Sequence, residues 1–312
     1  MATRTASRQR RTPARPRRRG GQPVLYLDPL YLLYGGLQSE DHVMILDLST
    51  VTHPHWHNPN VARAYRAAFD LIARRRPNIL AISENTADTL YANYGIPRER
   101  IAVVPLYVPD HFTAHAAVTP IHTPFPYVLF VGSVEARKNL IGAIEIFALS
   151  ELARKGYRLL VVGGAGHGNA EIQAAAARAR SVIFCGYLSN EELHGLYAEA
   201  TAFLYPSYLE GFGVPLLEAL HFGVPAVAST TGACPEVGGG LMRHFDPDDH
   251  AGFANELRRL VALSPEERAG YREKATSWIA GRYALPHYER ALKASLDARR
   301  PEARNVPGHE AA

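Results

Sequence analysis

Cysteine is scarce in this chain, which has only two, Cys185 and Cys234, among 312 residues. Both lie in apolar or glycine-rich segments, so the disulfide framework of a small secreted protein is not expected. No run reaches the roughly 18 apolar residues that a membrane helix needs. The apolar stretch 24–37 is broken by Asp28, Pro29 and two glycines, unlike a signal peptide. The sequence therefore predicts a cytoplasmic protein.

Acidic residues are missing from the first 20 positions, which hold eight arginines. Taking these eight from the 34 basic residues leaves 26 against 30 acidic ones, so the remainder is mildly acidic. A run rich in Arg, Pro, Ser and Thr buries little apolar surface, and we predict disordered tails over 1–22 and 301–312. Solvation explains the basic tail most simply. Attraction to anionic lipid or nucleic acid and a misplaced start codon are the alternatives.

The remainder alternates short apolar runs with helical patterns, as parallel α/β domains do. Strands are predicted first at 42–46, 78–82 and 101–104, then at 127–131, 158–162, 182–185, 202–205 and 225–228. Helices are predicted at 60–75, 85–94, 138–155, 169–179, 190–200 and 215–222. Right-handed crossovers bring the loops after such strands to one edge of the sheet, where ligands of these folds bind.

The predicted domains are unequal in size. We expect an N-terminal domain at 23–112, a proline-containing linker at 113–126, a larger domain at 127–284 and a C-terminal helix at 285–300. About 90 residues before the linker are few for a complete sheet domain, and no run predicts a first strand ahead of 42–46. A reduced domain, a misplaced gene start or a requirement for a partner subunit would each explain this.

The most informative segment runs from Glu210 to Glu218. Between the two carboxylates lie Gly211, Phe212, Gly213 and Val214, and Pro215 suits the first turn of a following helix. The N–H groups at a helix start favour a diphosphate, while carboxylates accept hydrogen bonds from sugar hydroxyls. The segment thus predicts a site for a phosphorylated sugar.

A second candidate loop carries two adjacent cations. Gly132 and Ser133 leave a predicted strand, and Arg137 and Lys138 open the following helix. Arginine forks onto phosphate oxygens and lysine acts as a point charge. A merely solvated basic helix start is disfavoured, because cations there oppose the helix dipole.

Three further loops give weaker signals. Gly163 and Gly164 follow a strand, but such turns often serve packing alone. Tyr187 and Leu188 follow the next strand and offer a face for a nucleobase, with plain packing as the alternative. Glu236, in the last of these loops, reads equally well as a helix-start carboxylate.

Over residues 125–285 the order and spacing of these loops resemble the retaining GT-B glycosyltransferases of family four. The matching features are the Arg-Lys-Asn loop, the Gly-Tyr-Leu-Ser loop and the segment Glu-Gly-Phe-Gly-Val-Pro-Leu-Leu-Glu. The resemblance implies two Rossmann-type domains facing a cleft, the N-terminal one reduced here. It also implies metal-independent catalysis without a cofactor, and no Asp-x-Asp motif stands at a suitable strand end.

The resemblance assigns roles to individual residues. Glu210 would lie beside the donor sugar, Glu218 would hold the ribose, and Lys138 with Arg137 would neutralise the leaving phosphate. The residues expected to bind the donor are Gly132, Ser133, Gly163, Gly164, Tyr187, Leu188, Gly211, Phe212, Gly213, Val214 and Glu218. Many relatives have arginine where this chain has Ser133, so one phosphate cation is missing or replaced by Arg137.

The N-terminal half is expected to bind the acceptor. Three alternating histidines, His53, His55 and His57, follow the strand at 42–46. By resemblance, His53 or His55 would assist the acceptor hydroxyl, and His53 is our candidate. A structural turn is an equal alternative, and a metal site is disfavoured by Pro54. The arginine-flanked helix at 60–75 reads as docked on its own sheet, with contact to an anionic membrane as the alternative. Ser83, which opens the next helix, is placed near the cleft by analogy.

The sequence thus predicts a transferase for polysaccharide biosynthesis that moves a hexose from a nucleoside diphosphate to a glycan or lipid-linked saccharide, with retention. Mannose is the preferred sugar, by resemblance alone. A peripheral position at the inner membrane face fits a lipid-linked acceptor, and no nucleic-acid partner is expected. The alternatives are a non-catalytic nucleotide-sugar-binding subunit and, less favoured, a sugar-nucleotide epimerase.

Overall fold

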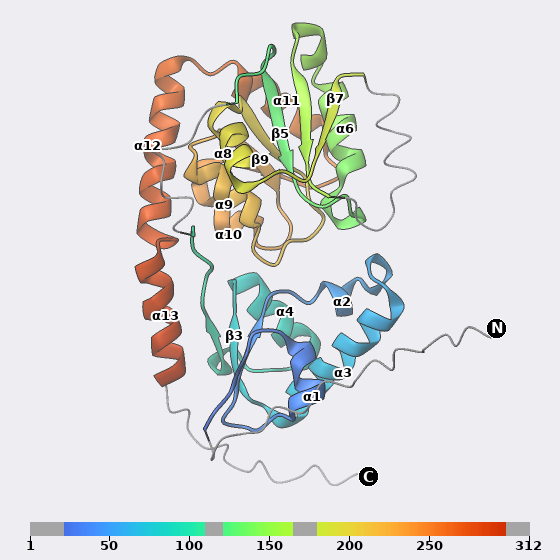
Figure 1. Ribbon diagram of the computed structural model, residues 1–312, viewed down its shortest axis with the longest axis vertical. Coiled ribbons are helices and arrows are strands. Elements are labelled where there is room, and N and C mark those ends of the chain that lie inside the picture. Colours follow the sequence, from blue (N-terminus) through green and yellow to red (C-terminus); the bar gives the residue numbers. More distant parts are fainter. Residues whose placement is uncertain (1–21, 110–120, 165–179, 298–312) are drawn as a thin grey trace, which may run out of the picture.

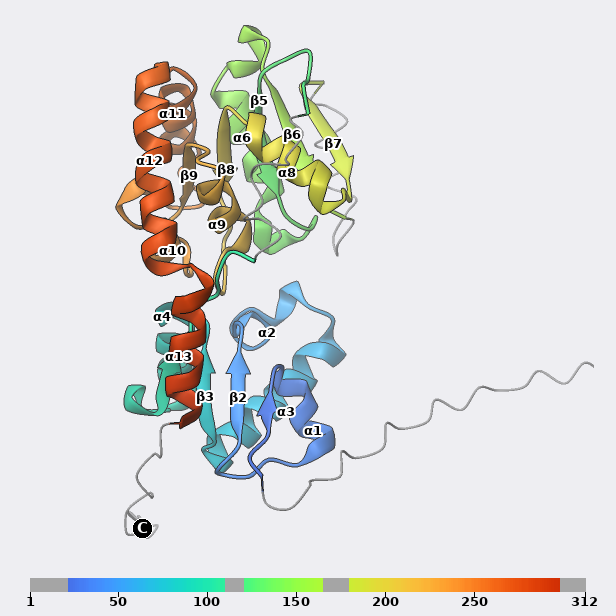
Figure 2. The same cartoon turned by 60° about the vertical axis from the view of Figure 1, so that its left-hand side comes forward.

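The computed structural model describes residues 22–109, 121–164 and 180–297. Two α/β units lie one above the other, each built on a parallel sheet (Figure 1). The chain runs through the smaller unit first, then through the larger one, and returns along both in its last helices (Figure 2).

The first unit has a four-stranded sheet in the order β1-β2-β3-β4, with every pair parallel. Its core is a buried apolar cluster between sheet and helices, in which Phe69 and Ile72 of α3 are fully buried. The strands are β1 (Leu25–Tyr26), β2 (His42–Ile45), β3 (Asn78–Ala81) and β4 (Ile101–Val103). The helices are α1 (Leu32–Gly35), α2 (Ser49–Thr52), α3 (Pro59–Arg75) and α4 (Glu84–Tyr94), with short 3-10 turns at Pro29–Tyr31, Pro54–Trp56 and Arg98–Arg100.

The second unit has a six-stranded parallel sheet in the order β10-β9-β8-β5-β6-β7. From β5 the chain first adds β6 and β7 on one side and then adds β8, β9 and β10 on the other side. The loop after β5 therefore lies at the switch in strand order, where ligands of open α/β sheets bind. The strands are β5 (Tyr127–Val131), β6 (Arg158–Val162), β7 (Val182–Gly186), β8 (Ala202–Tyr205), β9 (Ala226–Ser229) and β10 (Arg243–Phe245). The helices are α6 (Leu140–Leu149), α8 (Asn190–Glu199), α9 (Val214–His221), α10 (Cys234–Gly238) and α11 (His250–Val261), with 3-10 turns at Ala136–Lys138, Leu152–Lys155 and Gly239–Leu241.

The last two helices join the units. Helix α12 (Pro265–Arg282) packs on the second unit, and α13 (Leu285–Asp297) continues down beside the first (Figures 1 and 2). At this junction the N–H of Val108 donates to the carbonyl of Tyr283 at 2.9 Å, and the rings of Tyr107 and Tyr288 lie 4.9 Å apart. A single buried cluster also runs from Met44 and Leu80 in the first unit into the second. The two units therefore share apolar packing.

Most predicted elements are confirmed. Every strand predicted from the sequence is present within one residue of its expected bounds, as are the helices expected at 60–75, 85–94, 190–200 and 215–222. Ser189 and Glu192 form the expected capping box of α8, and Gly95 ends α4 in the left-handed conformation. The helix expected at 169–179 and the predicted tails, except Gln22, lie outside the described residues, as does most of the predicted linker.

Two predictions are wrong. The segment 138–155 is not one helix, because Asn139 and Glu151 both take the left-handed conformation and confine α6 to Leu140–Leu149. A first strand does precede 42–46: β1 pairs in parallel with β2. With only two residues before the Asp28-Pro29 turn, β1 is too short to give an alternating pattern. Among the described residues, no helix is long and apolar enough to cross a membrane.

Candidate active site

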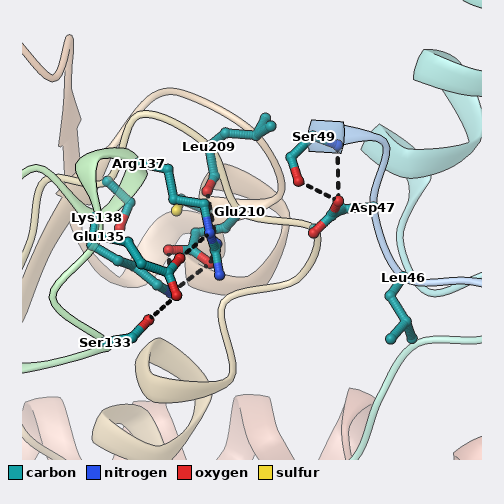
Figure 3. Close-up of polar contacts among 12 residues, drawn as sticks. Leu46, Asp47, Ser49, Ser133, Glu135, Arg137, Lys138, Leu209 and Glu210 are labelled. Carbon is teal, nitrogen blue, oxygen red and sulfur yellow. Dashed lines mark hydrogen bonds and ion pairs between the residues drawn. The ribbon is translucent and has the colours of Figure 1, made fainter. Parts of the chain in front are cut away.

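Lys138 lies at the heart of the site, on the loop that leaves β5. It ends the 3-10 turn Ala136–Lys138 and is only 6% exposed. Its Nζ donates to Oε1 and Oε2 of Glu210 at 2.7 and 2.9 Å (Figure 3). It also donates to the hydroxyl of Tyr205 at 3.2 Å. The structure thus brings together two residues that are 72 positions apart in sequence and pairs their charges away from water.

Arg137 lies beside this pair and bridges two carboxylates. Its Nε donates to Glu135 at 2.9 Å and its Nη1 to Glu210 at 3.3 Å (Figure 3). Burial raises the pKa of Glu135, but the hydrogen bond from Ser133 and the charge of Arg137 outweigh it and hold the pKa below its ordinary value. Ser133 donates to Glu135 at 2.7 Å, so this serine positions Arg137 through the carboxylate.

The Gly-Phe-Gly segment lies where the two units touch. A side chain at Gly211 would place its Cβ 2.2 Å from the carbonyl oxygen of Leu46, so only glycine permits this approach. The Oγ of Ser83 donates to the carbonyl of Gly211 at 2.7 Å, which puts Ser83 at the cleft as expected. Phe212 is buried and meets the ring of Tyr283 edge-on. Gly211 and Phe212 therefore form part of the contact between the units.

Gly213 directly precedes helix α9, and Glu218 lies within it. Gly213 adopts a φ of 93° and precedes a helix start that has no side-chain cap. Glu218 is half-buried and accepts a hydrogen bond from the Tyr197 hydroxyl at 2.8 Å. Burial raises the pKa of Glu218 to about 7, and the bond from Tyr197 only partly opposes the rise. This carboxyl group can therefore be protonated near neutral pH.

The second glycine loop packs against the first. Gly163 has a φ of 151°, and a Cβ there would lie 2.0 Å from the carbonyl oxygen of Gly132. Nothing lies within 4 Å of a Cβ at Gly164. Of the other predicted donor-binding residues, Tyr187 is 86% exposed and Leu188 packs on the core. The need for glycine at position 163 thus follows from packing of the two loops, and the predicted donor contacts stay predictions.

Across the cleft, the first unit contributes a hydrogen-bonded row of three side chains. Asp47 Oδ1 accepts from the N–H and the hydroxyl of Ser49, at 2.8 and 2.7 Å, and His57 Nε2 lies 3.0 Å from the Ser49 hydroxyl. These residues line a pocket of about 380 Å³, with Glu135 and Arg137 on its opposite wall. The pocket therefore has walls from both units.

His53, the histidine singled out from the sequence, does not line this pocket. Its ring stacks on Trp56 at 4.2 Å with an interplanar angle of 5°, and it hydrogen-bonds Thr52. Burial and the neighbouring His55 and His57 lower the pKa of His53. His57 is the histidine of this segment that lines the pocket. The sequence could not show which histidine faces the pocket, because the 3-10 turn at Pro54–Trp56 interrupts the regular alternation of side chains.

Several residues of the site gave no sequence signal. Tyr205 is the last residue of a buried strand, and Glu135 reads as an ordinary loop carboxylate until its contacts with Ser133 and Arg137 are seen. Among the described residues, no group of three or more His, Cys, Asp or Glu side chains is arranged to hold a metal ion.

Two parallel α/β units that face each other across a cleft define the GT-B class of fold. Comparison with solved structures supports this: WaaG, a glycosyltransferase involved in lipopolysaccharide biosynthesis, superposes with a TM-score of 0.65 over 88% of this chain and 76% of its own, at 18% identity. The family model described as glycosyl transferases group 1 matches residues 112–278, and the chain belongs to that family.

Two relatives with named activities are similar to this chain over about two thirds of its length. The O-antigen chain mannosyltransferase B of Escherichia coli is 30% identical over 217 residues, which are 65% of this chain and 56% of that protein. The 2-deoxystreptamine glucosyltransferase of Streptomyces kanamyceticus is 31% identical over 247 residues, 70% of this chain and 62% of its own length. The match therefore spans a little over half the length of each of these two relatives.

Proposed function

We propose that this protein is a retaining glycosyltransferase that moves a hexose, preferentially mannose, from a nucleoside diphosphate to a glycan or lipid-linked saccharide. The observation that carries the proposal is the buried contact of Lys138 with Glu210, with Arg137 beside it, at the edge of the donor sheet. Fixed cations serve this reaction because negative charge grows on the departing diphosphate. The O-antigen mannosyltransferase among the relatives supports mannose and a role in polysaccharide assembly.

The proposed roles follow from the chemistry of each group. Lys138 and Arg137 stabilise the charge of the leaving diphosphate, and Glu210 holds both cations while its oxygens face the transferred sugar. The uncapped start of α9 offers N–H donors from Val214 onward to the diphosphate. Glu218 binds the ribose, and its raised pKa lets it donate as well as accept. We propose no metal and no cofactor in this step.

A nucleotide-sugar-binding subunit without activity of its own is the second candidate. The short four-stranded first unit favours it, since less surface is available to bind an acceptor. The intact Lys138–Glu210 pair favours catalysis instead. Peripheral attachment to a membrane also stays a proposal: one face of α3 is buried on its own sheet, while Arg74 and Arg75 near its end are exposed.

A donor screen with a matched pair of variants tests the proposal. Purified chain is incubated with GDP-mannose and several UDP-hexoses, with and without mannoside acceptors, and sugar transfer and hydrolysis are measured. We expect Glu210→Gln to lose at least about 100-fold in turnover, because the carboxylate lies where charge develops. Glu273→Gln, on the exposed face of α12, serves as the control and should match the wild type. Donor binding by calorimetry without any transfer or hydrolysis would leave only the binding-subunit interpretation.

A further inference from the structure

The hydrogen bonds among Asp47, Ser49 and His57 determine which nitrogen of the His57 imidazole carries the proton. The hydroxyl of Ser49 has a single proton, and it donates this proton to Asp47 Oδ1, which as a carboxylate can only accept. The same hydroxyl oxygen then has only lone pairs left for His57 Nε2, 3.0 Å away, so Nε2 must carry the proton of that bond. In a neutral imidazole, Nδ1 is consequently an acceptor.

His57 is held neutral and in place by its surroundings. Burial lowers the pKa of His57, and Arg137 across the pocket lowers it further, while Asp47 and Glu135 oppose the change. Ser49 is buried, and it receives support from Asp47 at both its N–H and its hydroxyl. The side chain of His57 therefore has a fixed orientation, and no described residue is hydrogen-bonded to its Nδ1.

The pocket that His57 lines also has an aromatic surface. Trp56 lines the same pocket, with one face covered by His53. On the opposite unit the ring of Tyr208 lies 6.4 Å from Trp56 at an interplanar angle of 28°, and the N–H of Tyr208 is bonded to the carbonyl of Arg137 at 2.8 Å. A flat apolar ring beside polar side chains suits a sugar, which has an apolar C–H face and hydroxyls at its rim.

We propose that Trp56 and His57 form the acceptor subsite, with the C–H face of a neutral hexoside on Trp56 and one of its hydroxyls donating to His57 Nδ1. Ser49 and Asp47 are positioning residues that orient His57. This inference rests on the proposed transferase function, and it assigns the acceptor contact to His57 rather than to His53. The pocket places the subsite opposite Arg137, the residue that adjoins the donor side.

The kinetic test uses two substitutions that mimic different ring nitrogens. His57→Gln places its amide near the Nε2 position and loses the Nδ1 acceptor, whereas His57→Asn places its amide near the Nδ1 position and can retain it. We expect His57→Gln to raise the acceptor KM about tenfold, the effect of one hydrogen bond, and His57→Asn to raise it less, with donor affinity unchanged in both. His122→Gln, at a histidine whose side chain is 81% exposed, is the control. Wild-type KM in His57→Gln, or an equal loss of donor affinity, overturns the inference.

The role of Ser49 is tested by separating KM from stability. Ser49→Ala should raise the acceptor KM because His57 loses its orientation, while donor affinity stays at the wild-type value. Ser39→Ala, which removes an exposed hydroxyl bonded to Glu40, is the control. If Ser49→Ala lowers the melting temperature and leaves the acceptor KM unchanged, its role is structural only and the positioning claim fails.

A binding measurement separates this inference from the proposed function. The chain has two tryptophans, Trp56 and Trp278, so a full-length Trp278→Phe variant reports Trp56 fluorescence alone. We expect methyl α-mannoside or α-mannobiose to give a saturable change that weakens about tenfold when His57→Gln is added. Saturation without any sugar transfer in the donor screen would refute the transferase and leave the subsite standing. No change with either sugar, or with methyl α-glucoside, would refute the subsite.

Discussion

The buried amino group of Lys138 donates two hydrogen bonds to Glu210, and Arg137 donates to the same carboxylate. Replacing the lysine by methionine would leave Glu210, only 4% exposed, with Arg137 at 3.3 Å as its remaining cation. We expect Lys138→Met to lower the free energy of unfolding by about 3 kcal/mol, measured by denaturant titration. Lys155→Met, at an exposed lysine, should leave it unchanged. Equal stability of the two variants would mean that the buried pair contributes nothing.

Glu218 gives the fold a pH dependence of opposite sign to that of most carboxylates. Burial raises its pKa from the ordinary 4.5 to about 7, so the folded protein holds a proton that the unfolded chain has lost in this window. Its stabilising contribution is complete below pH 4.5 and is lost as the pH rises through about 7, at no more than about 1.4 kcal/mol per pH unit. Denaturant titrations at pH 5 and pH 7.5 should therefore show a smaller loss of stability in Glu218→Gln than in the wild type. Parallel pH profiles of the two proteins would contradict this.

At the scale of single residues, the sequence was a better guide to which residues form the site than to which side chains contact one another. Glu210, Lys138 and Arg137 were predicted to belong to one site, and the structure places them in contact. The pairing of Ser133 with Glu135 and the place of His57 in the pocket wall depend on how loops from different elements meet, which no local pattern encodes. The donor-binding roles of Tyr187, Leu188, Gly163 and Gly164 stay predictions.

The loops that follow β5 and β6 pack so closely that an added methyl group at position 163 would push them apart. Because a Cβ at position 163 would lie 2.0 Å from the Gly132 carbonyl and φ is 151°, Gly163→Ala should lower the free energy of unfolding by more than about 2 kcal/mol. Gly164→Ala is the matched control, since nothing lies within 4 Å of a Cβ there, and we expect its melting temperature to match the wild type. If both variants melt alike, the two loops must be free to move apart.

Elements with strong local signals were predicted well from the sequence, and short ones were not. The buried strands β5, β6 and β8 form apolar runs, and their bounds were predicted to the residue. Strand β1 has two residues and β10 has three, too few for a period to be visible, although each completes an edge of its sheet. The break after α6 arises from Glu151 in the left-handed conformation, which its residue type does not announce.

The carboxylate of Glu236, whose role the sequence did not settle, links the two units. Glu236 of the second unit accepts from the N–H groups of Glu84 and Asn85, at 2.9 and 3.5 Å, at the first turn of α4 in the first unit. It thus caps a helix of the other unit, and Ser83 bonded to Gly211 adds a second link. Burial raises the pKa of Glu236, while these two N–H groups oppose the rise.

We expect Glu236→Ala to loosen the association of the two units, because the N–H groups of α4 lose an acceptor worth about 1 kcal/mol. Small-angle X-ray scattering should show a larger radius of gyration, and the effect should grow when Ser83→Ala is added. Glu273→Ala, an exposed carboxylate on α12, should scatter as the wild type does. A radius of gyration that is unchanged in the double variant would mean that apolar packing alone holds the units together.

The hydrogen bond between Val108 and Tyr283 and the ring contact between Tyr107 and Tyr288 hold the outgoing chain against the returning one. Both passages between the units that the structure describes thus lie together on the side where α13 runs, away from α2 (Figure 1). Because the two connections run side by side along one edge, the units can rotate about that edge as about a hinge, whereas sliding of one unit across the other is restricted. Any separation of the two units would therefore be smallest beside α13 and widest at α2, on the opposite edge (Figure 1), which is where the acceptor that we propose would enter most easily.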